Sequence, residues 1–199
     1  MTVKKYLLLV VAIVIIFCPA CSRTSEFDTI AKTCSEVTGE DIELSNAEID
    51  NYSNGYHYTF FHNKSNYSNS SYQFSISSES MRIDLSEFGS GKKAREEWDS
   101  IEIRKDGDEE DTSPVVEYYF YEENKDNGYV VSLYSDWGTP NVIFNAEYLI
   151  GKDRLSFEIS LYSDKGKEEY AKYLEICNRL NLYISKDISD CIAETEFVY

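Results

Sequence analysis

The chain has 199 residues, with 19 Lys or Arg against 36 Asp or Glu, so its formal net charge is −17. Aromatic residues make up 15% of it and only 3 residues are Pro, which excludes a disordered or fibrous protein. Phosphate backbones repel so acidic a chain, and we therefore expect no nucleic-acid partner. The length suits one domain, or two very small ones.

The first twenty residues have the anatomy of a secretory signal peptide. Lys4 and Lys5 precede an uncharged apolar run at residues 6–17, which is shorter than the roughly 20 residues that span a bilayer. Ala20 and Cys21 follow, and this end resembles a bacterial lipobox, in which cleavage precedes a Cys whose thiol is acylated. We therefore expect a signal peptide over 1–20 and lipidation of Cys21. An unacylated cleaved signal and an uncleaved anchor remain the alternatives.

Three further cysteines, Cys34, Cys177 and Cys191, follow the expected anchor. An extracytoplasmic location permits disulfides, and three cysteines form at most one intrachain pair. Cys34 and Cys177 also fit the alternative of small buried apolar residues on helix faces. The cysteine spacing does not match a zinc site, and we expect neither metal nor cofactor.

Helix and strand signals alternate along the first half of the remaining chain. Apolar residues recur at helical spacing over 25–37, and Gly39 is a stop signal. Residues 56–62, 72–77 and 81–86 predict strands, with an Asn/Ser-rich loop over 63–71. Ser90 is a candidate N-cap for a second helix that contains Trp98. The acidic stretch 106–111 predicts a solvated loop, and a calcium loop there is the disfavoured alternative.

The second half begins with two predicted hairpins. Residues 115–121 and 129–134 predict strands joined by a turn at Asn127-Gly128. Residues 142–150 and 154–162 predict the clearest hairpin, because apolar and polar residues alternate strictly in its second arm. The longest predicted helix covers 167–182, and the tail 185–199 has no clear period.

This order of elements predicts an α+β fold, in which an antiparallel sheet built from hairpins carries about three helices packed on one face. We assign residues 21–24 to the lipidated Cys and a short tether, 25–184 to one domain and 185–199 to a C-terminal tail. A weak echo between the strand–helix units starting at Ile83 and Ile159 indicates either a duplication or the ordinary likeness of such units.

The layout resembles the small uncharacterised lipoproteins of Gram-positive anaerobic bacteria. The resemblance rests on the lipobox, the helix over 25–37, the strand–helix unit MRIDLSEF…KAREEW, and the hairpin before the closing helix with EICNRLNL. It covers most of the mature chain as an arrangement of elements. It implies a lipid anchor at Cys21 and brings no activity and no other site residue.

No nucleophile, phosphate-loop or metalloprotease motif is present in the sequence. The aromatic residues of the strand over 115–121 indicate either a central strand covered on both sides or a ligand-binding surface. In the second interpretation Tyr119, Tyr121 and the loop residue Trp137 grip a glycan or peptide.

We therefore expect a non-enzymatic binding or accessory domain, lipid-anchored on the extracytoplasmic side of the cell membrane. Its expected partner is an envelope protein, peptide or glycan. The alternatives are an envelope hydrolase that uses two carboxylates, a purely structural envelope protein, and a secreted protein without lipid. A cleft with two carboxylates of raised pKa would favour the hydrolase.

Overall fold

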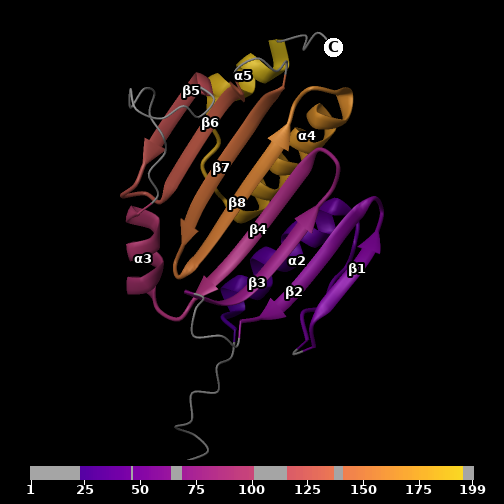
Figure 1. The fold of residues 1–199 in the computed structure, drawn as a ribbon, viewed down its shortest axis with the longest axis vertical. Helices are drawn as coiled ribbons and strands as arrows, with labels where there is room; N and C mark the ends of the chain where they lie inside the picture. The colour runs from indigo at the N-terminus through magenta and orange to yellow at the C-terminus, as the bar shows by residue number, and fades with distance from the viewer. Residues whose placement is uncertain (1–22, 46, 64–68, 101–115, 137–140, 195–199) are drawn as a thin grey trace, which may run out of the picture.

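The computed structural model describes residues 23–45, 47–63, 69–100, 116–136 and 141–194. Its centre is an 8-stranded sheet in the order β1-β2-β3-β4-β8-β7-β6-β5 (Figure 1), and every neighbouring pair is antiparallel. This confirms the α+β class and the antiparallel sheet. The strands are β1 (Ile49–Ser53), β2 (Tyr56–His62), β3 (Ser70–Ser77), β4 (Met81–Phe88), β5 (Val116–Asn124), β6 (Tyr129–Asp136), β7 (Val142–Ile150) and β8 (Asp153–Ser160). The helices are α2 (Ser25–Thr38), α3 (Gly91–Asp99), α4 (Asp164–Leu180) and α5 (Lys186–Glu194).

Two four-stranded meanders meet in the middle of the sheet. The chain runs from the edge strand β1 inward to β4, crosses through α3 to the opposite edge at β5, and returns inward to β8. Strands β4 and β8 then pair antiparallel, with Ile83 opposite Phe157. Within each meander, strands that follow one another in the chain are antiparallel neighbours, which is the arrangement that alternating hairpin sequences favour.

One face of the sheet, here called the apolar face, is covered by α2, α4 and α5. Figure 1 shows α2 and α4 behind the strands, and alternate residues such as Leu85, Leu155 and Phe157 pack beneath them in the main core. Buried tyrosines also belong to this core. The Tyr148 hydroxyl lies 2.8 Å from that of Tyr173 and donates to the carbonyl of Tyr183 at 2.7 Å.

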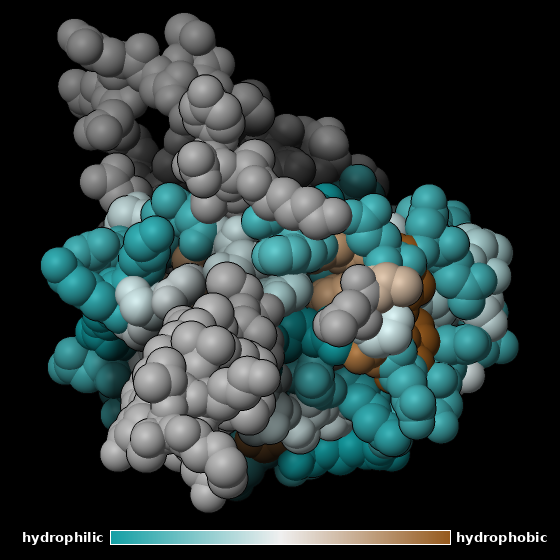
Figure 2. All heavy atoms as spheres, turned by 90° about the horizontal axis from the view of Figure 1, so that it is seen from below, coloured by the Kyte–Doolittle hydropathy of each residue, from teal (hydrophilic) through white to brown (hydrophobic). Residues whose placement is uncertain are grey.

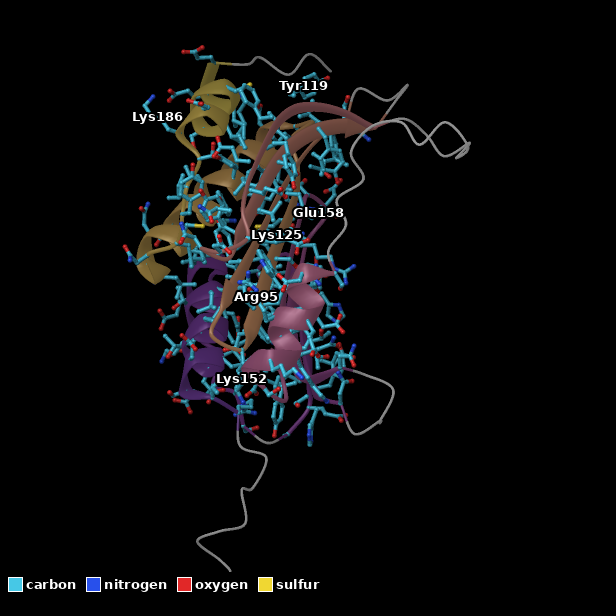
Figure 3. All side chains as sticks on the ribbon, turned by 90° about the vertical axis from the view of Figure 1, so that its left-hand side faces the viewer. Arg95, Tyr119, Lys125, Lys152, Glu158 and Lys186 are labelled. Carbon is cyan, nitrogen blue, oxygen red and sulfur yellow. The ribbon has the colours of Figure 1, made fainter. Side chains whose placement is uncertain are left out.

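Helix α3 lies on the other side of the sheet, here called the polar face. Figure 3 shows α2 and α3 separated by the strands. Trp98 and Ala94 of α3 are buried but belong to no part of the main core cluster. Arg95 holds the helix to the β5–β6 turn by donating to the carbonyl of Lys125 at 3.0 Å. The prediction that all helices share one face is therefore corrected for α3, because an amphipathic stripe does not encode which face it covers.

The hydrogen bonds at the helix ends agree with most of the predicted boundaries. Thr24 caps α2 by accepting from the Phe27 amide at 3.1 Å, and Gly39 ends it at φ 101°. Ser90 caps α3 as predicted, through the Lys93 amide at 3.2 Å. Helix α4 begins earlier than predicted, at Asp164 after the Ser163 cap. A Cβ at Gly166 would lie 2.2 Å from the Ser160 carbonyl oxygen, so glycine is required where α4 leaves the sheet.

Two elements were not predicted. Strand β1 has mostly exposed residues and precedes the turn Asn54-Gly55, whose φ values are 53° and 81°. Helix α5 occupies much of the region predicted as a tail, and Ile188 and Ile192 on one of its faces are buried in the main core.

Within the described residues no helix has the length and apolar character needed to cross a membrane. The expected signal peptide, Cys21, the acidic stretch 106–111 and Trp137 lie outside these residues.

Candidate functional site

A groove of about 350 Å³ crosses the polar face over β2, β3, β4 and β8. The strand registers place its side chains in two rows across the sheet. One row runs from Phe61 through Gln73 and Ser86 to Arg154, and the next runs from Ser75 through Asp84 to Ser156. The lining includes Phe61, Gln73, Ser75, Arg82, Asp84, Ser86, Phe88, Arg154 and Ser156.

Ion pairs hold both arginines of the groove in place. Arg82 Nε lies 2.6 Å from Asp84 Oδ2, and this hydrogen bond raises the pKa of the Arg82 guanidinium. Arg154 contacts Glu147 of β7 through Nε at 2.9 Å and Nη2 at 2.7 Å. Because each pair uses only part of the guanidinium, further N–H groups are left to donate to a ligand.

The groove differs from the rest of the chain in charge and in chemistry. Its lining has two arginines and one carboxylate, although the whole chain has a net charge of −17. Serine hydroxyls and the Gln73 amide both donate and accept hydrogen bonds. Phe61 is 38% exposed and adds a flat apolar ring at the end of one row. This combination suits a neutral or weakly acidic ligand rich in hydroxyl groups.

The aromatic residues predicted to form a binding surface on β5 do not line up as one row on one face of the strand. A register irregularity between Tyr118 and Phe120 interrupts the alternation that placed Tyr119 and Tyr121 on one face. Tyr119 is 48% exposed, and its hydroxyl donates to Ser135 Oγ at 3.2 Å. The Tyr121 hydroxyl donates to Glu123. Trp137 lies outside the described residues, so ligand binding by this trio stays a prediction.

Cys34, Cys177 and Cys191 are thiols in this structure. Burial raises the pKa of Cys34, and it raises the pKa of Cys177 to about 11. Cys177 belongs to the buried side of α4, with its sulfur 3.6 Å from the Tyr148 hydroxyl, and Cys191 is partly exposed on α5. A buried thiol with a raised pKa is a poor nucleophile. Cys34 and Cys177 are buried as small apolar residues are, and a disulfide within the trio stays a prediction.

A second cluster of polar groups lies where the chain enters α2. Glu87 of β4 and Asp153 of β8 are 1% and 0% exposed, and Glu87 pairs with Lys152. Burial, and then the nearby carboxylates Glu87 and Glu26, raise the pKa of Asp153 to about 7. One oxygen of each buried carboxylate, Glu87 Oε2 and Asp153 Oδ1, has no hydrogen-bond partner.

Glu87 and Asp153 are a pair of neighbouring carboxylates, but they do not line a cleft. Their burial keeps both oxygens away from any substrate in solution, which weighs against the catalytic alternative. In the described part of the chain, no group of three or more Asp, Glu, His or Cys side chains could hold a metal ion. The cluster instead ties the start of α2 to the centre of the sheet.

Sequence reasoning missed both places. The alternation in β4 and β8 predicted a wet face, which is where Arg82, Asp84, Arg154 and Ser156 lie. It did not show that β4 and β8 are neighbours, because strand order across a long crossover is not encoded locally. The burial of Asp153 follows from its parity with Leu155 and Phe157 on the apolar face, a signal that was available.

A scan against protein-family models gave no match, and a search of curated proteins gave none either. A search of solved structures returned the solution structure of the cyanobacterial PsbP protein (CyanoP) from Synechocystis sp. PCC 6803. The match covers 68% of this chain and 91% of that one, at 11% identity and a TM-score of 0.26. A similarity at this level supports no statement about function.

Proposed function

We propose that the chain is a non-enzymatic, lipid-anchored domain of the extracytoplasmic membrane surface, and that it binds an envelope glycan in the groove on its polar face. The observation that carries the binding function is the groove itself, with a half-exposed ring beside a row of hydroxyl, amide and arginine groups. The anchor rests on Cys21 and the apolar run before it.

A glycan suits the groove better than a peptide or an apolar partner. Sugar hydroxyls both donate and accept, as do Ser75, Ser86 and Ser156, whereas an extended peptide binds along the free edge of a sheet. The groove lies over β2–β3–β4–β8, inside the sheet, where every backbone ladder is already occupied. Its two arginines also accommodate the acidic substituents of envelope polymers.

Calorimetry with soluble oligomers of N-acetylglucosamine tests the binding function. We expect Phe61→Ala to weaken binding by about tenfold or more, which corresponds to about 1.4 kcal/mol. Tyr52→Ala is the matched control, because Tyr52 is an aromatic residue on the edge strand β1 that is 73% exposed and does not line the groove. No binding, or equal losses in both variants, would contradict the glycan assignment.

The intact mass of the protein extracted from its native membranes tests the anchor. A mass equal to residues 21–199 plus acyl groups supports lipidation at Cys21. An unmodified mature chain recovered from the medium would contradict the anchor and favour the secreted alternative. The glycan assay gives an independent result, since the groove lies on the folded domain and not on the anchor.

A further inference from the structure

The side chain of Arg23, two residues after Cys21, is built into the folded domain. Only 9% of the side chain is exposed, and Nε pairs with Asp28 at 2.8 Å. Its two terminal nitrogens donate to the carbonyls of Ser45, at 2.6 Å, and Leu44. The guanidinium also lies 4.7 Å from the centre of the Phe60 ring. An arginine with this many simultaneous contacts does not act as a flexible tether.

Thr24 extends this attachment to the centre of the sheet. Its amide donates to Glu87 Oε1 at 3.3 Å, and its hydroxyl donates to Asp153 Oδ2 at 3.4 Å. Glu87 and Asp153 are fully buried, so Thr24 is held by groups that do not move with the solvent. The segment expected to be a tether over 21–24 therefore has two of its four residues bound to the domain.

The remaining reach between Cys21 and the domain is very short. Only Ser22 separates Cys21 from Arg23, and two peptide units span at most about 7 Å. The headgroup layer of one leaflet is about 5–7 Å thick. An acylated Cys21 would consequently bring Arg23 and the adjoining end of the domain to the headgroups.

The end of the molecule next to Arg23 also includes the start of α3 and the β7–β8 turn. The Phe88 amide at the end of β4 donates to the Lys152 carbonyl at 3.0 Å, and Ser90 follows as the α3 cap. Lys92 and Lys93 are exposed in the first turn of α3. In Figure 3, Lys152 marks this end and Lys186 of α5 marks the opposite one. Figure 2 views the molecule from this end, and its coloured residues form a mostly hydrophilic surface whose largest apolar area lies on the right.

We propose that the end of the domain formed by Arg23, the β7–β8 turn and the start of α3 rests on the phospholipid headgroups, with the sheet upright on the bilayer. The proposal rests on the proposed anchor and adds a fixed orientation to it. The strands then run along the membrane normal, and the groove on the polar face opens sideways, toward polymer lying above the membrane. Lys92 and Lys93 face the lipid phosphates.

Headgroup quenching of fluorescent labels at the two ends tests this orientation. The acylated protein is placed in vesicles of phosphatidylcholine and phosphatidylglycerol that contain a nitroxide headgroup lipid. One label is attached at Lys93→Cys and the other, in a second sample, at Lys186→Cys, because both lysines are exposed. A Cys191→Ser background removes the partly exposed thiol, and the buried Cys34 and Cys177 resist labelling. We expect severalfold stronger quenching at position 93 than at 186, and equal quenching would overturn the orientation.

Insertion of a spacer between Ser22 and Arg23 tests whether the short tether causes the difference in quenching between the two labels. About 20 residues of Gly and Ser add a mean reach of about 25 Å and leave every contact of Arg23 intact. We expect the difference between the two labels to disappear, and its persistence would overturn the role of the short tether. The intact mass is measured first. An unmodified chain overturns both the anchor and the orientation, whereas an acylated chain with equal quenching overturns the orientation alone.

Discussion

The two faces of the sheet are made by the same strands but differ in almost every physical property. In β8, Leu155, Phe157 and Ile159 lie in the main core, while Arg154, Ser156 and Glu158 alternate with them on the polar face. The apolar face is covered by α2, α4 and α5, and Tyr148, Tyr173, Cys34 and Cys177 are buried there. Among the described residues, α3 alone covers part of the polar face. The first face therefore supplies stability, and the second is available for binding.

The two meanders show a related asymmetry. Both run inward from an edge strand and end in a helix, so that β4–α3 and β8–α4 are equivalent in order. Because β4 and β8 are antiparallel neighbours, a two-fold rotation about an axis perpendicular to the sheet superposes one on the other. Such a rotation keeps each face of the sheet on its own side, so it would put both helices on the same face. Helix α3 instead lies across the sheet from α2 and α4 (Figure 3). The strands repeat and the helices do not. Helix α3 covers the polar face beside β4 and β7, and the groove lies on another part of that face, over β2, β3, β4 and β8.

The largest expected effect sets two neighbouring residues of β8 against each other. Phe157→Ala removes a ring that is 1% exposed and should lower the free energy of unfolding by about 3–5 kcal/mol. Glu158→Ala, one residue further on the exposed polar face, should change it by no more than about 0.5 kcal/mol. Urea denaturation of both variants checks the comparison. A similar loss in both would show that the polar face also contributes to the core.

The outcome of this comparison depends on the alternation of apolar and polar residues along a strand. This alternation was the most reliable guide to the fold in the sequence. The β7–β8 hairpin was predicted because Leu155, Phe157 and Ile159 alternate with polar residues, and α2 because its apolar spacing ends at Gly39. Both signals are local. Strand β1 was not predicted, because a mostly exposed edge strand lacks the regular apolar–polar alternation of a half-buried one. The Asn54-Gly55 pair is nevertheless a strong hairpin signal.

The groove and the face of α3 could not be predicted, because both depend on which distant strands become neighbours. Arg82 and Arg154 are 72 residues apart by their numbers and face the same groove only because β4 pairs with β8. The irregularity beside Tyr119 is a one-residue change of register, which reverses the faces of all later side chains. No composition or spacing in the strand sequence announces it.

A smaller effect concerns the buried carboxylate on the apolar face. Burial, and then Glu87, raise the pKa of Asp153 from 3.8 to about 7 in the folded protein. The folded state therefore binds more protons than the unfolded state between these values, and stability falls as pH rises from about 4 to 7. Asp153→Asn should abolish this loss and stabilise the protein at pH 8 by roughly 2–4 kcal/mol.

Chemical denaturation at pH 5 and at pH 8 measures this effect. Asp126→Asn is the control, because its carboxylate is fully exposed and lies 3.7 Å from Arg95 Nη2. The interactions of Asp153 with Glu87, Glu26, Lys152 and Thr24 place the effect at the start of α2. An unchanged pH dependence in Asp153→Asn would mean that Asp153 is ionised without cost, for instance through its pairing with Thr24.

The smallest effect compares the capping residues of two helices on opposite faces. Ser163→Ala and Ser90→Ala each remove a hydroxyl that accepts from a first-turn amide, at 3.4 Å in α4 and 3.2 Å in α3, and each should cost about 1 kcal/mol. Helix α4 buries residues along its whole length, whereas α3 buries only Ala94 and Trp98. Loss of the α4 cap should therefore lower the global free energy of unfolding.

Loss of the α3 cap should appear as faster amide exchange confined to that helix, because a short helix with few buried contacts opens locally before the sheet does. Hydrogen exchange and global unfolding, measured on both variants, distinguish a local from a global loss of stability. A fall in the global free energy of unfolding of Ser90→Ala would show that α3 unfolds together with the apolar core and not as a separate unit on the polar face.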